Sequence, residues 1–312
     1  MPDVSTPSVC FYLRTPDAHR VHVRVSGPPD GEPWLVLHGG PGSGCSASMA
    51  GWFDPQRHRV VMPDQRGAGR STPAGSVRRN NVGALLADLE QLRQALGIAR
   101  WGVVGGSWGA ALALAYAARY PDAVAALVLR GAFLTGRDDV LGLFAPRRAG
   151  RRMLQCVTPR GERLPDARAR LNTVSQLFQS GTTAQKRDTA AAWRAGEQAL
   201  LGLSPRLRAR RQPVREQVAT MNKYRIQAHY LRNRAGLGKP ALLKAAREIA
   251  AHGVPVRLLH GRADAVCRPA NALRLQAAMP QAHLNWVAGG HLATGAMRDA
   301  LAAAIRAAAW QR

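Results

Sequence analysis

The pentapeptide Gly105-Gly106-Ser107-Trp108-Gly109 constrains this chain more than any other segment. An apolar run over 101–104 leads into it, and a run of small apolar residues over 110–118 leads out of it. This order predicts a strand, a sharp turn and a helix, with the serine hydroxyl exposed at the turn. The flanking residues must be glycine because a Cβ there would make the strand and the helix clash. Taken alone the pattern also occurs by chance in glycine-rich turns, so the rest of the chain must decide.

Strands and helices alternate along most of the chain, which predicts a mainly parallel sheet covered by helices on both faces. We expect a hairpin of edge strands over 11–26, further strands over 34–37, 58–62, 101–104, 123–130, 254–260 and 283–287, and helices over 82–96, 110–118, 270–279 and 297–309. Helical spacing over 82–96 places Leu85, Leu89 and Leu92 on an apolar side and leaves Asp88 on a polar face.

The segment 134–244 interrupts this alternation, since it contains no convincing buried strand. Helical stretches such as 189–201 indicate a helical insertion instead. We therefore predict an α/β fold in which residues 1–133 and 245–312 form the core and residues 134–244 form an inserted, arginine-rich helical cap.

The net charge of +25 is unusual and is concentrated in the predicted cap. Residues 134–244 contain 23 basic and 7 acidic residues. Such a field could attract nucleic acid or an acidic partner. However, neither a nucleic-acid-binding signature nor interleaved aromatic residues accompany it. We therefore predict a solvated basic surface without a specific nucleic-acid partner, and the arginine bias also fits a G+C-rich genome.

Composition and cysteine spacing bound the class of protein. An apolar content of 46% fits a globular chain with a well-buried core. Residues 1–20 lack the apolar segment of a signal peptide, and the low-charge stretch 107–118 is too short to span a bilayer. Four cysteines lie far apart without a C-x-x-C pair: Cys10, Cys45, Cys156 and Cys267. We predict a cytoplasmic protein without metal, cofactor, disulfide framework or membrane partner; its oligomeric state stays open.

A second glycine-rich segment, His38-Gly39-Gly40-Pro41-Gly42, directly follows the strand predicted over 34–37. Such a loop presents backbone N–H groups in a concave turn. In α/β-hydrolases one oxyanion-hole amide comes from this loop and the other from the residue after the nucleophile. We therefore predict the amides of Gly40 and Trp108 as the oxyanion hole. We expect His38 to hold the turn through a hydrogen bond of its ring. The alternative to an oxyanion loop is that the whole segment is only a tight turn.

A serine becomes a good nucleophile when a histidine takes its proton and a carboxylate orients that histidine. In α/β-hydrolases the three residues follow in the order Ser, Asp, His. Asp264 and His291 each follow a predicted strand, at the edge where a parallel sheet presents its catalytic groups. The sequence therefore predicts a triad of Ser107, Asp264 and His291.

A competing acid, Asp64, also follows a predicted strand but precedes the serine. We interpret Asp64-Gln65-Arg66 as a structural loop that braces the oxyanion region. In this interpretation Arg66 pairs with a carboxylate or with backbone.

Together these motifs resemble the proline iminopeptidases (prolyl aminopeptidases), a serine-peptidase family of α/β-hydrolases with a helical cap. The segments that carry the resemblance are His38–Gly42, Asp64–Ser71, Gly105–Gly109, Leu129–Phe133 and His260–Cys267. The similarity runs from about Phe11 to the C-terminus and is thin in the cap. It implies release of an N-terminal proline through an acyl-enzyme formed on Ser107. His291 would be the base and Asp264 its orienting acid, and Phe133 matches an aromatic residue that lines the proline pocket.

The cap departs from the family pattern at the residues that would bind the substrate's α-ammonium. Family caps carry a segment ending in Trp-Glu, whose glutamate binds the ammonium. Here the glutamate is Glu197, and its neighbour is Gly196 in place of tryptophan. The family's second ammonium-binding glutamate corresponds to Gln227. Without the resemblance, Glu197 would be interpreted as a solvated helix position.

Three hypotheses of function follow from the sequence. The first is a serine aminopeptidase that releases an N-terminal proline, or a similar small residue, from small peptides. The second is an esterase or amidase that uses the same triad on another substrate. The third is a non-catalytic basic binding module on a hydrolase scaffold. A complete set of triad and oxyanion candidates argues against the third.

Overall fold

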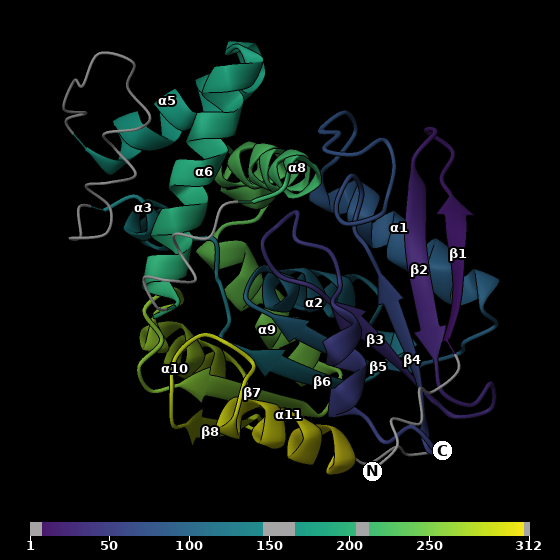
Figure 1. The fold of residues 1–312 in the computed structure, drawn as a ribbon. Coiled ribbons are helices and arrows are strands. Elements are labelled where there is room, and N and C mark those ends of the chain that lie inside the picture. The colour runs from purple at the N-terminus through teal and green to yellow at the C-terminus, as the bar shows by residue number, and fades with distance from the viewer. Residues whose placement is uncertain (1–7, 146–165, 204–211, 309–312) are drawn as a thin grey trace.

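The computed structural model describes residues 8–145, 166–203 and 212–308. Within these ranges one eight-stranded sheet runs through the molecule in the order β1-β2-β4-β3-β5-β6-β7-β8 (Figure 1). The strands are β1 (Ser8–Arg14), β2 (Arg20–Ser26), β3 (Glu32–Leu37), β4 (His58–Pro63), β5 (Trp101–Gly106), β6 (Val124–Arg130), β7 (Val256–Gly261) and β8 (His283–Val287). β1 and β2 pair antiparallel with their neighbours, and the strands from β4 to β8 are parallel. Loops that follow these parallel strands therefore meet at one edge.

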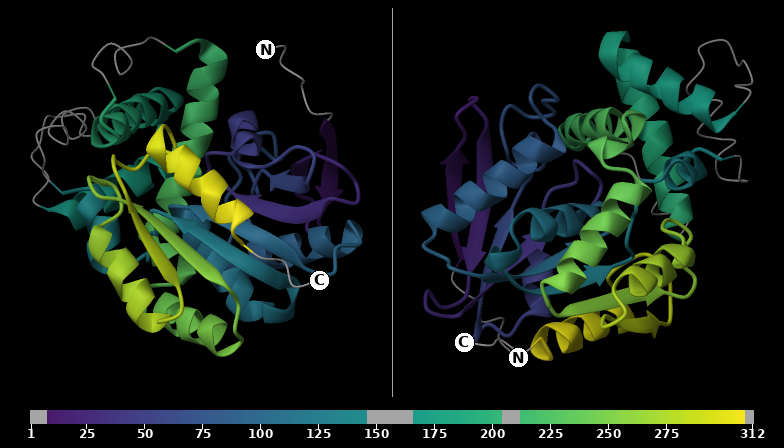
Figure 2. Two further views of the ribbon diagram at one scale, coloured as in Figure 1. Left: turned by 90° about the horizontal axis from the view of Figure 1, so that it is seen from below. Right: turned by 180° about the vertical axis from the view of Figure 1, so that it is seen from behind.

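Helices cover both faces of the sheet, as predicted (Figure 2). One face packs against α1 (Val82–Ala95), α2 (Trp108–Arg119), α9 (Lys239–Ala251) and α10 (Pro269–Ala278), and the other against α11 (Ala296–Arg306) and the 3₁₀ helix η1 (Ala47–Trp52). In β5, for example, Val103 belongs to the first face and Val104 to the second. Burial on both faces explains why the central strands are continuous apolar runs.

The N-terminal hairpin is present, but only one of its strands lies at an edge. β2 pairs with β4 as well as with β1, through the register Val23–Pro63 to Ser26–Val60. The prediction of two edge strands was therefore wrong for β2, which has a neighbour on each side. Alternation of apolar and polar residues does not distinguish an edge strand from an inner antiparallel strand. Two short 3₁₀ helices, η2 (Pro121–Ala123) and η3 (Arg234–Gly236), connect other elements.

Four helices of the predicted insertion gather beside the ends of β6 and β7: α3 (Arg137–Leu143), α5 (Ala167–Ser180), α6 (Thr183–Leu200) and α8 (Val214–Arg232) (Figure 1). Their apolar side chains pack around Trp193, whose ring stacks on Tyr224 with 5.0 Å between ring centroids. The predicted boundary at residue 244 falls inside α9, which packs against α2 in the main core. We therefore propose that the insertion ends before Lys239.

Helix α8 fastens the insertion to the core. The hydroxyl of Tyr230 donates to Oδ1 of Asn80 at 2.6 Å, and the ring of His229 bonds to the carbonyl of Asn80 at 2.8 Å. The Tyr230 ring also packs on Trp108 at the start of α2, with 4.9 Å between centroids. α8 is thus held directly against the turn that carries Ser107.

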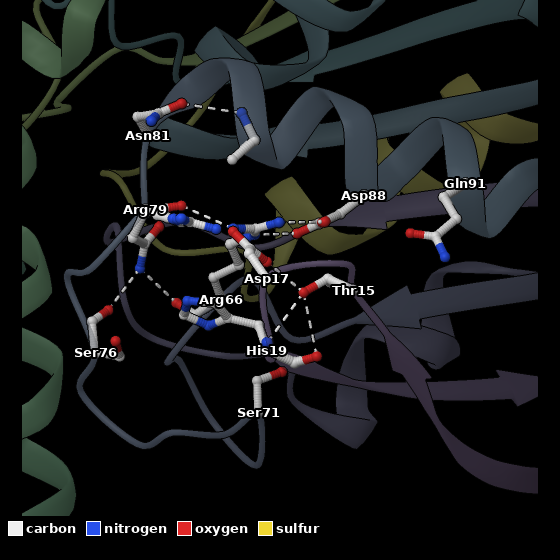
Figure 3. A network of polar contacts seen from close by, with 12 residues as sticks. Thr15, Asp17, His19, Arg66, Ser71, Ser76, Arg79, Asn81, Asp88 and Gln91 are labelled. Atoms are coloured by element: carbon white, nitrogen blue, oxygen red, sulfur yellow. Dashed lines mark hydrogen bonds and ion pairs between the residues drawn. The ribbon is translucent and has the colours of Figure 1, made fainter.

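Arg66 organises the loop that follows β4 (Figure 3). Its Nε and Nη2 atoms donate to both carboxylate oxygens of Asp88 at 2.6 and 2.8 Å. Its Nη1 atom donates to Asp17 at 2.5 Å and to the carbonyl of Arg79 at 2.8 Å. The predicted pairing of Arg66 is confirmed. The placement of Asp88 on a polar face of its helix was wrong: the side chain is buried, because the guanidinium supplies its partner.

Two further predictions concern the whole chain. In the part of the chain that the structure describes, no helix is long and apolar enough to cross a membrane. Cys10, Cys45 and Cys267 are free thiols. Cys156 and the predicted last helical residue, Ala309, lie outside the described residues.

We expect Asp17 to stabilise the fold in a pH-dependent manner. Burial opposes ionisation of its carboxyl, but hydrogen bonds from Thr15 and Arg66 lower its pKa to about 2. A carboxyl whose pKa is lowered in the folded state stabilises it above the ordinary pKa and loses that effect as the pH falls toward the folded value. Asp17→Asn should lower the free energy of unfolding by about 2 kcal/mol at neutral pH.

Urea denaturation at about pH 7 and about pH 3 measures this effect. The difference between wild type and Asp17→Asn should shrink by about half at the lower pH. Asp30→Asn, at an exposed turn position, is the matched control. A difference that is the same at both pH values would contradict the ion-pair assignment.

Candidate active site

The strand, sharp turn and helix predicted around Ser107 are present. Ser107 lies between β5 and α2 with φ 57° and ψ −119°, a backbone conformation that non-glycine residues rarely adopt. A Cβ on Gly105 would overlap the carbonyl of Gly109, and a Cβ on Gly109 would overlap the carbonyl of Leu37. The two glycines therefore allow α2 to begin directly against the sheet, and the turn pushes the serine out of it.

Asp264 and His291 come together at the ends of β7 and β8. Nδ1 of His291 donates to Oδ2 of Asp264 at 2.7 Å. The other carboxylate oxygen accepts the amides of Val266 and Cys267 at 2.9 and 2.8 Å. Burial opposes ionisation, but the His291 bond and the two amides hold the pKa of Asp264 below its ordinary value. Asp264 is therefore a carboxylate that fixes the histidine with Nε2 free to act as a base.

Ser107 and His291 line one cavity of about 240 Å³. The serine Oγ has its polar contact with Sγ of Cys267 at 3.8 Å. Among the residues that the structure describes, no hydrogen bond joins Ser107 to His291. Catalytic hydrogen bonds are often long in a site without substrate and shorten in the reactive complex. The two residues are thus brought to the same cavity, and the nucleophile–base contact itself is not formed.

The glycine-rich loop after β3 lies against the turn that carries Ser107. Gly39 and Gly40 both line the cavity of Ser107, and Gly40 has φ +116°. A Cβ on Gly39 would lie 3.4 Å from Cβ of Ser107. As the first residue of α2, Trp108 contributes an amide that no helical carbonyl can accept. The predicted oxyanion residues are therefore placed beside the serine.

Gln65 ties the two parts of this region together. Nδ1 of His38 donates to the carbonyl of Gly39 at 2.9 Å, and Nε2 accepts the amide of Gln65 at 3.0 Å. The Gln65 side chain donates to the carbonyl of His38 at 3.0 Å and accepts from Nε1 of Trp108 at 2.8 Å. Burial lowers the pKa of His38, so its ring stays neutral. The prediction that the His38 ring holds this turn is confirmed.

Asp64 is part of the structural frame. Its carboxylate accepts the amide of Cys45 at 2.6 Å and the amide of Arg70 at 2.9 Å, and Nδ1 of His22 lies 3.3 Å away. These contacts link the loop after β3 to the loop after β4. Its partners thus lie away from the Asp264–His291 pair, as expected for a bracing residue.

The cavity extends from Ser107 to the helices of the insertion. Phe133, Glu197 and Gln227, the residues predicted to bind substrate, all line it. Phe133 directly follows the turn after β6 and donates its amide to the carbonyl of Ser107 at 3.4 Å. Trp193 forms another part of the apolar wall. Ser107 and the residues predicted to bind substrate therefore line one cavity with apolar walls.

Glu197 is an ion-paired residue in the wall of the cavity. Its Oε2 atom accepts from Nζ of Lys223 at 2.5 Å and from the hydroxyl of Tyr224 at 2.8 Å. Burial opposes ionisation, but the charge and hydrogen bond of Lys223 lower the pKa of the carboxyl. Gln227 is buried, and its Oε1 atom has no hydrogen-bond partner in the described structure. The interpretation of Glu197 as a solvated helix position is thus wrong.

Two further residues that line the cavity, Lys223 and Arg130, were not predicted from the sequence. Lys223 precedes Gln227 by four residues on α8, so the i, i+4 spacing could have placed both on one side of a helix. Arg130 ends β6, lines the cavity and donates from Nη1 to the carbonyl of His291. Over the described ranges, no group of three or more His, Cys, Asp and Glu side chains is placed to hold a metal ion.

Comparison with known proteins places the chain among related sequences. Residues 33–294 match the family model described as alpha/beta hydrolase fold. The proline iminopeptidase of Xylella fastidiosa is 37% identical over 299 residues, covering 92% of each chain. That of Neisseria gonorrhoeae is 34% identical and covers 98% of this chain and 97% of its own. A solved hydrolase from Pseudomonas aeruginosa shares the fold, with a TM-score of 0.64 at 19% identity over 96% of this chain and 97% of its own.

We expect the two candidate acids to respond differently to loss of charge. Asp264→Asn should reduce kcat for p-nitrophenyl acetate by about 10⁴-fold, because an amide favours the wrong histidine tautomer. Asp64→Asn should lower the melting temperature and keep kcat within about tenfold, because it braces loops without contacting His291.

Ser107→Ala supplies the background rate of this ester assay, and circular dichroism verifies that each variant is folded. A folded Asp64→Asn protein without activity, beside an active Asp264→Asn protein, would show that the acid of the triad had been assigned wrongly.

Proposed function

The chain belongs to the proline iminopeptidase family of α/β hydrolases, and from this we propose that it releases an N-terminal proline, or a similar small residue, from small peptides. The observation that carries the proposal is the single cavity that joins Ser107 and the Asp264–His291 pair to the carboxylate of Glu197. A nucleophile and an anion that line one cavity match a substrate whose amine lies next to its reacting carbonyl.

In the proposed acylation step, Oγ of Ser107 attacks the carbonyl carbon of the first peptide bond while Nε2 of His291 takes the hydroxyl proton. Asp264 stabilises the imidazolium that forms. The amides of Gly40 and Trp108 hold the oxyanion. The intermediate collapses when His291 gives its proton to the leaving nitrogen, the C–N bond breaks, and the prolyl group remains as an ester on Ser107.

Deacylation repeats the same steps with water as the nucleophile. His291 takes a proton from the water, whose oxygen attacks the ester carbonyl. The oxyanion again lies on the two amides. Collapse returns the proton from His291 to Oγ of Ser107, the ester C–O bond breaks, and free proline leaves. The enzyme is restored without any added cofactor in this scheme.

The acyl pocket supports selection of an N-terminal residue. Phe133 and Trp193 offer apolar surface for a pyrrolidine ring. Glu197 and Gln227 offer a carboxylate and a neutral oxygen for the two N–H groups of a prolinium ion. An amine that has lost water needs such partners. Because one of them is neutral, we propose that free-amine selectivity is weaker here than in relatives with two acids.

A second candidate function is hydrolysis of an ester or amide with a neutral acyl group by the same triad. The contact of Glu197 with Lys223 favours it, since the carboxylate already has a cationic partner. Four chromogenic substrates separate the two functions: free-amine proline, free-amine alanine and N-blocked proline anilides, and a short acyl ester. Preference for the first over the third supports the aminopeptidase.

We also propose that the protein acts in the cytoplasm, where the free thiols of Cys10, Cys45 and Cys267 would persist. Its basic residues would form a solvated surface without a specific nucleic-acid partner. Salt-sensitive, sequence-independent adhesion to nucleic acid is compatible with this proposal.

Glu197→Gln should reduce kcat/KM for proline p-nitroanilide by about ten- to hundredfold, because it removes a charged hydrogen-bond acceptor from the substrate amine. Hydrolysis of p-nitrophenyl acetate, which has no amine, should change much less. Gln227→Glu should raise the ratio of anilide to ester activity. Steady-state kinetics with both substrates measure these ratios.

Glu248→Gln, on the exposed part of α9, is the matched control for loss of one carboxylate. If Glu197→Gln reduces amine and ester turnover equally, Glu197 does not bind the substrate amine, and the esterase or amidase function becomes the better proposal.

A further inference from the structure

Lys223 is a cationic partner of Glu197, the carboxylate proposed to bind the substrate amine. Its Nζ atom lies 2.5 Å from Oε2 of Glu197, and the two side chains are only 25% and 22% exposed. The same ammonium lies 4.8 Å from the centroid of the Tyr224 ring. Both Lys223 and Glu197 line the cavity that contains Ser107. An internal ammonium thus already satisfies the carboxylate assigned to the substrate.

We propose that Lys223 is a specificity-determining residue that competes with the substrate's ammonium for Glu197. The inference rests on the proposed amine-binding role of Glu197. Its consequence is a widened substrate class: the site accepts acyl groups with a neutral atom in place of the amine, at a smaller disadvantage than a site without the lysine.

The balance of charge in the cavity supports competition. Glu197 and Lys223 together are neutral, and Gln227 adds no charge. At the other end, Asp264 is engaged by His291, and Arg130 is a further cation in the cavity wall. A substrate ammonium therefore adds a positive charge to a site with no free carboxylate among its described lining residues. Either it displaces Lys223 or it lies beside it, and both cost affinity.

The geometry also explains why the lysine competes without closing the site. Lys223 and Tyr224 both donate to Oε2 of Glu197. The Gln227 side chain forms a further hydrogen bond with the Glu197 carboxylate, and its unpartnered Oε1 is left as an acceptor for a ligand. A pyrrolidine nitrogen could use this acceptor, but against the electrostatic field of the neighbouring ammonium. The lysine thus weakens amine binding and leaves space for the ring.

An alternative role for Lys223 is purely structural, holding Glu197 in position through the ion pair and the Tyr224 contact. The two roles predict opposite results when the charge is removed. Competition predicts tighter amine binding, because Glu197 becomes available. A structural role predicts weaker amine binding, because the carboxylate loses its orientation.

The test measures inhibition of p-nitrophenyl acetate hydrolysis by pyrrolidine hydrochloride, so that no aminopeptidase activity is needed. Lys223→Met keeps the aliphatic stem and removes the charge, and should lower the inhibition constant of pyrrolidine about tenfold or more. Lys223→Arg should keep the wild-type value. Cyclopentanol, a neutral ring of similar size, should inhibit wild type and Lys223→Met equally. Lys244→Met, at an exposed position of α9, is the matched control.

A double-mutant cycle with Glu197→Gln separates competition from general effects. In the Glu197→Gln background, Lys223→Met should tighten pyrrolidine binding much less than in the wild-type background, because only the direct repulsion between the two cations is then removed. Thermal unfolding identifies any variant that is not folded, and Lys223→Gln then serves as the second neutral variant. An unchanged or higher inhibition constant in a folded, uncharged variant would overturn the inference.

These measurements separate a failure of the inference about Lys223 from a failure of the proposed function. If wild type fails to hydrolyse proline p-nitroanilide but Lys223→Met tightens pyrrolidine binding, the aminopeptidase proposal fails and the inference about Lys223 stands. If the anilide is hydrolysed and Lys223→Met does not change pyrrolidine binding, the aminopeptidase proposal stands and the inference about Lys223 fails.

Discussion

Close packing of α2 against the sheet is the constraint on which the site depends. It exists because Gly105 and Gly109 have no side chains at the points where helix and strand backbones meet. The same packing forces Ser107 into its unusual conformation and buries the Trp108 side chain. That side chain then becomes a common contact, bonded to Gln65 of the oxyanion region and packed on Tyr230 of the insertion. Ser107, the loop after β3 and the insertion are therefore positioned relative to one tryptophan.

Two buried carboxylates, Asp264 and Glu197, are kept ionised in the same way. Asp264 and Glu197 both stay ionised although burial opposes it, because hydrogen-bond donors surround each carboxylate. For Asp264 the donor is His291, which becomes a cation during the proposed reaction. For Glu197 it is Lys223, which is a cation from the start. In the mechanism proposed above, this difference makes Asp264 part of the chemistry and leaves Glu197 to exchange between an internal and an external ammonium.

The sequence was sufficient wherever position along the chain determines position in space. Asp264 and His291 each follow a parallel strand, so their meeting at one edge could be foreseen. The glycine spacing around Ser107, between a predicted strand and a predicted helix, indicated the turn that the structure contains. Local pattern failed where a partner comes from elsewhere. Asp88 has the spacing of a polar-face residue, but Arg66 allows its burial. The contact of Glu197 with Lys223 depends on how α6 packs on α8, which no local pattern contains.

Helix α8 fixes the position of the cavity-lining residues of the insertion relative to the core. One side of α8 carries Lys223, Gln227 and Tyr230 at helical spacing. The two residues that line the cavity and the tyrosine that contacts Asn80 and Trp108 therefore belong to one rigid helix. The distance from Ser107 to Lys223 and Gln227 therefore depends on where α8 contacts the core. Because α8 is docked on the turn that carries Ser107, its position would set the length of acyl group that fits between the proposed nucleophile and the residues proposed to bind the amine.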